Sequence, residues 1–206
     1  AMRNLSIPVI TMEKYGFDCP GVDILFDYEK GGYMATRHLI ECGHRRIGCV
    51  AGKQSFHVTM QRLNGYKKAL EESGISYDPD LVYFGDYTME SGYEAFSYIL
   101  GQKVTAIFSM NDEMAFGIYR AARLYGVSIP EDISIIGFDN VPFADVMQVP
   151  LTTIGVPVIE MGKKLGEKVV DLIDNKEKLK EREEILYTPR LLVRGSTKSI
   201  PPVTVI

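Results

Sequence analysis

The sequence predicts an α/β protein built on parallel sheets. Short runs rich in β-branched residues alternate with helix-length segments along most of the 206 residues, a pattern typical of parallel strands covered by helices on both faces. The chain is 46% hydrophobic, which is enough to bury a large core. No internal repeat or low-complexity linker interrupts the alternation. We therefore expect one large or two small compact α/β domains.

Seven apolar runs bounded by turn residues are candidate strands. In chain order they cover residues 7–12, 23–27, 47–51, 81–84, 106–109, 133–138 and 151–154. The best-defined helix is 112–125, because its apolar residues recur at helical spacing and Gly126 and Pro130 follow it, as at many helix C-termini. Residues 158–174 repeat the helical pattern. This order of elements is typical of a doubly wound sheet.

Polar residues follow two of the candidate strands. Asn111 and Asp112 come after 106–109, and Asp139 comes after 133–138. In an open parallel sheet, residues just past the carboxyl end of a strand lie where ligands bind, beside a helix N-terminus. Asn and Asp are also preferred N-caps. We expect Asp112 to cap helix 112–125 and Asn111 to contact a ligand, whereas Asp139 either contacts a ligand or caps a short helix around 142–147.

The chain contains no recognisable catalytic motif. Gly52-Lys53 is not part of a phosphate-binding loop, because Ile47 stands where that loop needs its first glycine. The patterns GxGxxG and GxSxG are absent as well. His38 and His44 flank a predicted helix end, where a positively charged imidazole interacts favourably with the helix dipole. No nucleophile, base and orienting acid can be assembled, so we do not expect an enzyme.

Charge and cysteine content bear on further classes. The net charge is −4 and no Lys/Arg patch is present, so this chain alone is not expected to bind nucleic acid. The run KEKLKEREE at 176–184 alternates in sign and is expected to be a solvated helix end or loop. Cys19, Cys42 and Cys49 form no CxxC pair and have no histidine at metal-ligand spacing, which predicts reduced thiols and neither a metal nor a cofactor.

Seven phrases occur in the order typical of one protein family. They are HLIECGHRRIGCVAG (38–52), QRLNGYKKALEESGI (61–75), GDYTMESGY (85–93), TAIFSMNDEMAFG (105–117), PEDISIIGFDN (130–140), PLTTI (150–154) and PRLLVRGST (189–197). Over nearly its whole length the chain resembles the LacI/GalR (lac-repressor/galactose-repressor) family of bacterial transcriptional regulators. Any one phrase would be a weak signal, whereas seven in order are a strong one.

The resemblance implies a periplasmic-binding-protein-like (type I) effector domain, with doubly wound parallel sheets in two lobes joined by three crossings. The family's chain begins with a helix-turn-helix headpiece, a hinge helix and the first βα units of the N-terminal lobe, which have no counterpart here. We therefore expect the DNA-binding headpiece to be absent and the N-terminal lobe to be incomplete. By analogy, the C-terminal lobe covers 28–153 plus 185–197, and the remnant of the N-terminal lobe covers 1–27 plus 154–184.

The same resemblance implies an effector site in the cleft. Residue by residue it places Arg62, Tyr87, Asn111 and Asp139 there, and with them Phe56, Val58, Glu13 and Val156. These residue types suit a polyol, because a guanidinium donates from a fixed fork, a carboxylate accepts from two hydroxyls, and an aromatic face packs against apolar sugar surface. Val58 and Val156 offer no hydrogen bond, so they carry the least information about the effector.

Taken together, the resemblance implies the effector-binding and dimerising part of a cytoplasmic transcriptional regulator. We expect a carbohydrate effector, a homodimer whose interface includes part of residues 28–40, and contact with operator DNA through the missing headpiece alone. The chain is not expected to associate with a membrane, since no apolar run approaches the roughly 20 residues that a span needs. Two alternatives stay open: a solute-binding protein of a sugar transporter, which shares the fold, and a small-molecule enzyme.

Overall fold

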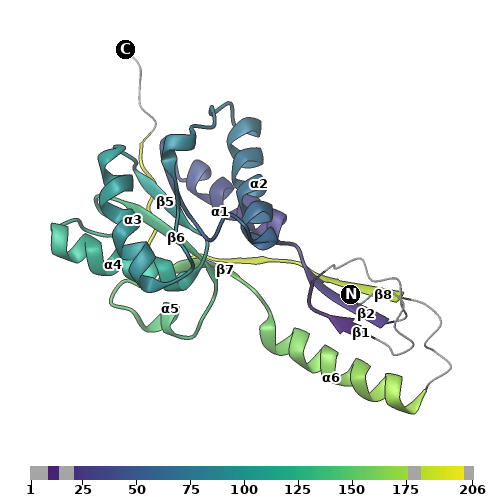
Figure 1. Cartoon of the computed structure of the whole chain (residues 1–206). Helices are drawn as coiled ribbons and strands as arrows, with labels where there is room; N and C mark the ends of the chain where they lie inside the picture. Colours follow the sequence, from purple (N-terminus) through teal and green to yellow (C-terminus); the bar gives the residue numbers. More distant parts are fainter. Residues whose placement is uncertain (1–8, 14–20, 176–181, 202–206) are drawn as a thin grey trace. The chain divides into compact units, whose positions relative to one another are not determined.

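The computed structural model describes residues 9–13, 21–175 and 182–201. The chain divides into two compact units, of which the first comprises Ala1–Asp27 with Val156–Pro189 and the second Tyr28–Gly155 with Arg190–Ile206. Figure 1 shows both units and labels most of their helices and strands. Each unit is an α/β structure with a predominantly parallel sheet, as the alternation of short apolar runs and helical segments predicts.

The second unit contains a mixed sheet with the strand order β4-β3-β5-β6-β7-β9 among the described residues. Its strands are β3 (Ile47–Ala51), β4 (Val82–Phe84), β5 (Ala106–Ser109), β6 (Ser134–Asp139), β7 (Thr152–Gly155) and β9 (Arg190–Leu192). All neighbours pair in parallel except β7 and β9. Because β3, β5 and β6 start in register at Ile47, Ala106 and Ser134, their carboxyl ends meet at one edge.

Helices cover both faces of this sheet. They are α1 (Tyr28–Glu41), α2 (His57–Glu72), α3 (Met89–Gly101) and α4 (Asp112–Tyr125), with the short η1 (Pro79–Leu81) and α5 (Phe143–Val146) in connections. The pair α1 and α2 lies on one side of the sheet and the pair α3 and α4 on the other (Figure 1). The central strands β3 and β5 are buried along their whole length, which explains why their sequences are almost entirely apolar.

Helix α4 begins and ends where the sequence predicts, but its cap is not the predicted residue. Asn111 is the N-cap, and its Oδ1 accepts a hydrogen bond from the Met114 amide at 2.9 Å. Gly126 ends the helix in the left-handed conformation with φ 69°. The assignment of Asp112 as the cap was wrong. Its side chain is fully buried and accepts a hydrogen bond from the Thr153 hydroxyl at 2.6 Å instead.

The first unit contains a parallel sheet in the order β1-β2-β8 and one helix among its described residues. These elements are β1 (Val9–Thr11), β2 (Gly21–Phe26), β8 (Arg182–Tyr187) and α6 (Val158–Asp174). Buried Asp23 on β2 is paired with Arg182 on β8, with Arg182 Nε 2.7 Å from Asp23 Oδ2. The expectation of a helix end or loop was wrong for 182–184, which begin β8, and residues 176–181 lie outside the described residues.

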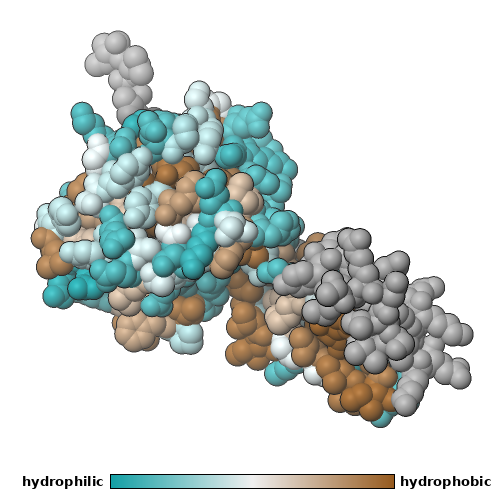
Figure 2. Space-filling model, in the orientation of Figure 1, coloured by the Kyte–Doolittle hydropathy of each residue, from teal (hydrophilic) through white to brown (hydrophobic). Residues whose placement is uncertain are grey.

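Helix α6 leaves much of its apolar face exposed in this unit. Met161 is its buried residue, whereas Val158, Ile159, Val170 and Ile173 are mostly exposed. Figure 2 shows hydrophobic residues gathered along this helix. In the described ranges, every helix is too short or too polar to cross a membrane.

Candidate ligand-binding site

Arg62 lies at the centre of the candidate site. It projects from α2 and is 6% exposed. Its Nη1 donates to the carbonyl oxygen of Met110, which follows β5, and its Nη2 lies 3.3 Å from Oδ1 of Asp139, the last residue of β6. One guanidinium thus spans the carboxyl ends of two neighbouring strands, where an open α/β sheet binds its ligands.

Aromatic rings surround this guanidinium. The Arg62 Cζ atom lies 3.8 Å from the ring centroid of Phe138, 5.0 Å from that of Tyr28 and 5.8 Å from that of Tyr87. The negative face of a ring attracts a cation, and this attraction is stronger where water is excluded. The buried Nε of Arg62 has no hydrogen-bond partner among the described residues. The arginine is therefore fixed by its planar faces and by two of its three nitrogens.

Asp139 is held in an uncommon backbone conformation at the edge of the site. Its φ is 110°, a region that residues other than glycine seldom adopt. Burial raises the pKa of its carboxyl, and the charge and hydrogen bond of Arg62 oppose that rise. The side chain is still 35% exposed, so a carboxylate oxygen is accessible beside the buried cation.

Tyr87 and Phe56 form an aromatic wall at the same edge. Their rings stack with centroids 6.2 Å apart and an interplanar angle of 21°. The Tyr87 hydroxyl lies 2.7 Å from Thr59 Oγ1 on α2. The backbone φ of Tyr87 is 74°. A Cβ at Gly52 would lie 2.0 Å from the Tyr87 ring, so a glycine is needed there. Phe56 is 45% exposed and presents apolar surface to solvent.

The Asn111 amide serves the protein itself. Besides capping α4, its Nδ2 donates to the Tyr87 carbonyl oxygen at 2.9 Å, which ties the end of β5 to the aromatic wall. The side chain is 8% exposed. Asn111 therefore lies beside the other site residues and supports them, and the direct ligand contact stays a prediction.

Three other predicted site residues lie one helical turn from Arg62 or in the other unit. Val58 is partly exposed in the first turn of α2, two residues after Phe56. Glu13 follows β1, and Val156 follows β7 as the first residue of the return into the first unit. The structure thus brings Phe56, Arg62 and Asp139 into one unit, and the parts that Glu13 and Val156 play stay predictions.

Sequence reasoning missed the cage around Arg62. Phe138 and Tyr28 approach its planar faces, and Thr59 fixes the Tyr87 hydroxyl. Phe138 stands next to Asp139 in the phrase GFDN, which is a usable signal. Tyr28 had none, because it lies 34 positions before Arg62 and meets it through the packing of α1 on α2.

His38 lies in the last turn of α1, as predicted, with its Nε2 2.9 Å from Thr197 Oγ1, whereas the assignment of His44 to a helix dipole was wrong. His44 is 1% exposed, with Nδ1 2.9 Å from Thr105 Oγ1 and Nε2 3.0 Å from Ser134 Oγ. Burial lowers the pKa of His44 and of His38, which favours the neutral imidazole in both. Among the described residues no group of histidine, cysteine or acidic side chains could hold a metal ion.

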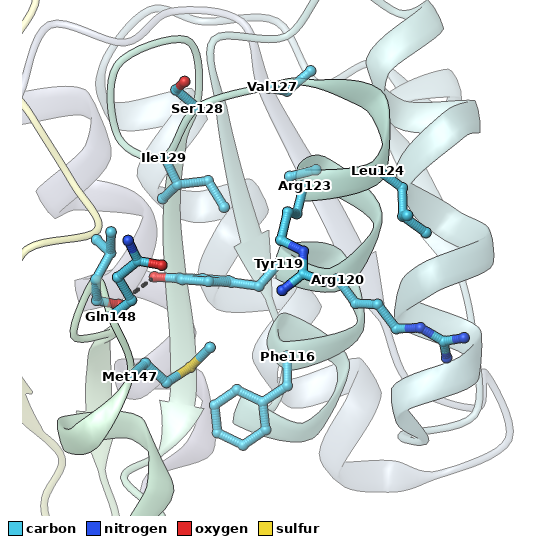
Figure 3. Close-up of a pocket in the computed structure, with 12 residues that line it drawn as sticks. Phe116, Tyr119, Arg120, Arg123, Leu124, Val127, Ser128, Ile129, Met147 and Gln148 are labelled. Atoms are coloured by element: carbon cyan, nitrogen blue, oxygen red, sulfur yellow. Dashed lines mark hydrogen bonds between the residues drawn. The ribbon is translucent and has the colours of Figure 1, made fainter.

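A separate hollow of about 720 Å³ lies on the second unit, away from these residues. Figure 3 shows α4 side chains, among them Phe116 and Tyr119, facing the segment that holds Met147 and Gln148. The Tyr119 hydroxyl donates to the Val149 carbonyl oxygen at 3.1 Å across its floor. This hollow is a feature of the α4 surface and contains none of the predicted effector contacts.

Residues 36–197 match the family of the periplasmic binding protein-like domain. The HTH-type transcriptional repressor PurR of Photobacterium profundum is 36% identical over 201 residues, which are 96% of this chain and 59% of the repressor's length. A crystal structure of a LacI family transcriptional regulator from Enterococcus faecium with bound ribose superposes with a TM-score of 0.83 at 33% identity, covering 94% of this chain and 71% of that one. The transcriptional regulator CelR in complex with cellobiose gives a TM-score of 0.81 at 34% identity, covering 91% of this chain and 58% of that one. The chain belongs to the LacI family of transcriptional regulators and carries its periplasmic binding protein-like domain.

Proposed function

We propose that this chain is the effector-binding part of a transcriptional regulator and that its effector is a sugar or a sugar derivative. The observation that carries the proposal is the buried Arg62 paired with a partly exposed Asp139, beside the aromatic wall of Tyr87 and Phe56. The bound ribose and cellobiose of two similar regulators support the same ligand class. Those regulators also favour a regulator over a transporter's solute-binding protein.

The chemistry of the site suits neighbouring hydroxyl groups. A sugar hydroxyl that leaves water must regain its hydrogen bonds, and the Asp139 carboxylate can accept from two hydroxyls. Burial raises the pKa of this carboxyl, and Arg62 opposes that rise. The exposed face of Phe56 then packs against the C–H surface of the sugar. A purely apolar ligand would displace water from the exposed side of the Asp139 carboxylate without replacing its hydrogen bonds, and such a loss disfavours binding.

We assign the two units to the two lobes of an effector domain. The second unit is then the C-terminal lobe, and the first is part of the N-terminal lobe and supplies Glu13 and Val156 to the ligand. A ligand that contacts both lobes favours the conformation in which both sets of contacts are made. Such a change of lobe angle would alter the spacing of the DNA-binding heads in the complete regulator.

The test is calorimetry of the complete gene product that contains this chain against pentoses, hexoses, their phosphates and purines. Asp139→Ala should weaken sugar binding by about 1–3 kcal/mol, because it leaves ligand hydroxyls unpaired in a buried site. Asp132→Ala is the matched control, since Asp132 is an exposed aspartate before the amino end of β6, whose carboxyl end carries Asp139. Tight binding of a purine with no sugar binding, or equal sugar affinity in both variants, would refute the assignment.

We further propose that the chain forms a homodimer and that the exposed residues of α5, beside α4, form part of its interface. Leu39 and Ile40 are buried within the second unit, so they are not available to a partner, whereas Tyr33 and Met34 of the same segment are partly exposed and their contribution stays a prediction. Phe143 and Val146 on α5 are 66% and 71% exposed, and they adjoin the hollow on α4 through the contact of Phe143 with Phe116. An apolar surface of this kind is typical of an interface between subunits.

Light scattering of wild type and Phe143→Asp tests this proposal at tens of micromolar, roughly where weak symmetric pairs form. We expect a dimer that dissociates in the variant, while Tyr98→Asp, which changes an aromatic residue exposed to 41% on α3, leaves it intact. A monomeric wild type, or dimers in both variants, would contradict the proposed interface.

A further inference from the structure

The loop that follows Asp139 begins with an uncommon backbone conformation. Residues 140–151 join β6 to β7, and the loop follows directly on Asp139. Two consecutive residues, Asp139 and Asn140, have φ values of 110° and 59°. In residues other than glycine such a conformation costs about 1–3 kcal/mol, so surrounding contacts must maintain it. The position of the Asp139 carboxylate therefore depends on what holds this loop.

Arg194, just after β9, contacts the loop at three points. Its Nη2 donates to Asn140 Oδ1 at 2.7 Å, its Nη1 donates to the Leu151 carbonyl oxygen at 2.8 Å, and its Nε lies 3.1 Å from Asp145 Oδ1. The Arg194 side chain is 18% exposed and that of Asp145 is 71% exposed, so the ion pair faces solvent on its aspartate side. One guanidinium thus ties together the beginning, the middle and the end of the loop.

A second group fixes the backbone beside the same residue. Buried Asp112 accepts a hydrogen bond from the Val141 amide at 2.9 Å, and its other oxygen accepts from Thr153. Asn140 is therefore held through its side chain by Arg194 and through the following peptide by Asp112. Arg62 holds the carboxylate of the preceding residue, Asp139, from the other direction. The two residues with positive φ are thus each held by an arginine, Asp139 by Arg62 and Asn140 by Arg194.

We propose that Arg194 is a positioning residue for effector binding: by clamping Asn140 and the loop, it fixes Asp139 in the orientation that receives the ligand. This inference rests on the proposed function of Asp139. An arginine is required because three contacts in three directions need the planar fork, which a lysine ammonium cannot reproduce. The clamp also connects the returning segment after β9 to the site, although Arg194 itself lies outside the effector contacts.

The first arm of the test needs no effector. Hydrogen exchange of the complete gene product is compared for wild type, Arg194→Lys and Arg120→Lys, where Arg120 is an exposed arginine that pairs with Glu90 on the same unit. We expect exchange in the segment 139–151, including the Val141 amide, to rise about tenfold in Arg194→Lys, the loss of one hydrogen bond to a charged group. Arg120→Lys should leave this segment unchanged.

The second arm uses ribose as the probe and asks whether Arg194 acts through Asp139. Arg194→Lys should weaken ribose binding about tenfold in the wild-type background and much less in the Asp139→Ala background, because coupled residues are not additive. Asn140→Gly added to Arg194→Lys should restore most of the affinity, since glycine adopts a positive φ without a clamp. A merely structural role would give additive losses and no such rescue.

Unchanged exchange in segment 139–151 of Arg194→Lys would overturn the proposal, as would additive losses of ribose affinity. If wild type does not bind ribose, the proposal that the effector is a pentose such as ribose is contradicted. The exchange arm then decides by itself whether Arg194 clamps the loop, so the two failures are distinguishable.

Discussion

Replacing the buried aspartate at the start of α4 should make the protein more stable at neutral pH. Asp112 is fully buried and has two hydrogen bonds, from Thr153 and from the Val141 amide. Burial raises the pKa of its carboxyl to about 6 from the ordinary 3.8, against the opposing effect of these hydrogen bonds. Asp112→Asn keeps the shape, and the amide can still accept from Val141 and donate to the Thr153 oxygen.

The sign and size follow from proton linkage. Because the folded pKa is raised, the stabilising contribution of Asp112 is fully present below pH 3.8 and is lost as pH rises through about 6. The difference between the folded and the ordinary pKa of Asp112 corresponds to about 3 kcal/mol of unfolding free energy. About 1.4 kcal/mol of this stability is lost between pH 5 and pH 8. Asp112→Asn carries no charge at any pH. We therefore expect the unfolding free energy of Asp112→Asn to exceed that of wild type by about 1–3 kcal/mol at pH 8 and by less at pH 5.

Urea unfolding followed by circular dichroism measures this difference, since the chain has no tryptophan to serve as a fluorescent probe. Asp132→Asn shows what the same substitution does at an exposed position of the same unit, and its effect is subtracted. The reasoning fails if Asp112→Asn is less stable than wild type at pH 8. It also fails if the difference between the two proteins does not grow from pH 5 to pH 8.

Two further predictions concern stability. Burial lowers the pKa of His44, so its contribution to stability is present above pH 6.5 and is lost as pH falls through the lower folded pKa. His44→Gln should therefore reduce the fall in unfolding free energy between pH 7.5 and pH 5. The same pH dependence in wild type and variant, measured by urea unfolding, would contradict this. A Cβ at Gly117 would lie 1.9 Å from the Met89 carbonyl oxygen, whereas one at Gly101 meets nothing within 4 Å. Thermal unfolding should show Gly117→Ala destabilised by about 1–3 kcal/mol and Gly101→Ala equal to or more stable than wild type, and equal melting temperatures would count against the close approach of α3 and α4.

Local sequence pattern was sufficient for most of the elements. All seven candidate strands contain an observed strand. The central ones, such as β3 and β5, are buried along their whole length, and this burial gives the continuous apolar runs that the sequence shows. Strands β8 and β9 were not predicted. β8 reads REEILY with mostly exposed residues, and β9 has three residues, so both become strands by pairing with β2 and β7. Such edge strands depend on a neighbour that the local sequence does not contain.

At the site, the sequence determined which residue types follow the strands, and the tertiary structure decided what each one does. Asn111 and Asp112 are equally good caps by residue type. Asp112 is buried and hydrogen-bonded to Thr153, which is 41 positions away, and Asn111 caps α4. Arg62 and Asp139 are 77 positions apart, and nothing local predicts that their side chains meet. Burial lowers the pKa of His44, and the segments around it are as distant as Lys198, whose carbonyl oxygen lies 3.2 Å from His44 Nε2. Side-chain partners and pKa values depend on dielectric and contact, and these exist only once distant segments have packed together.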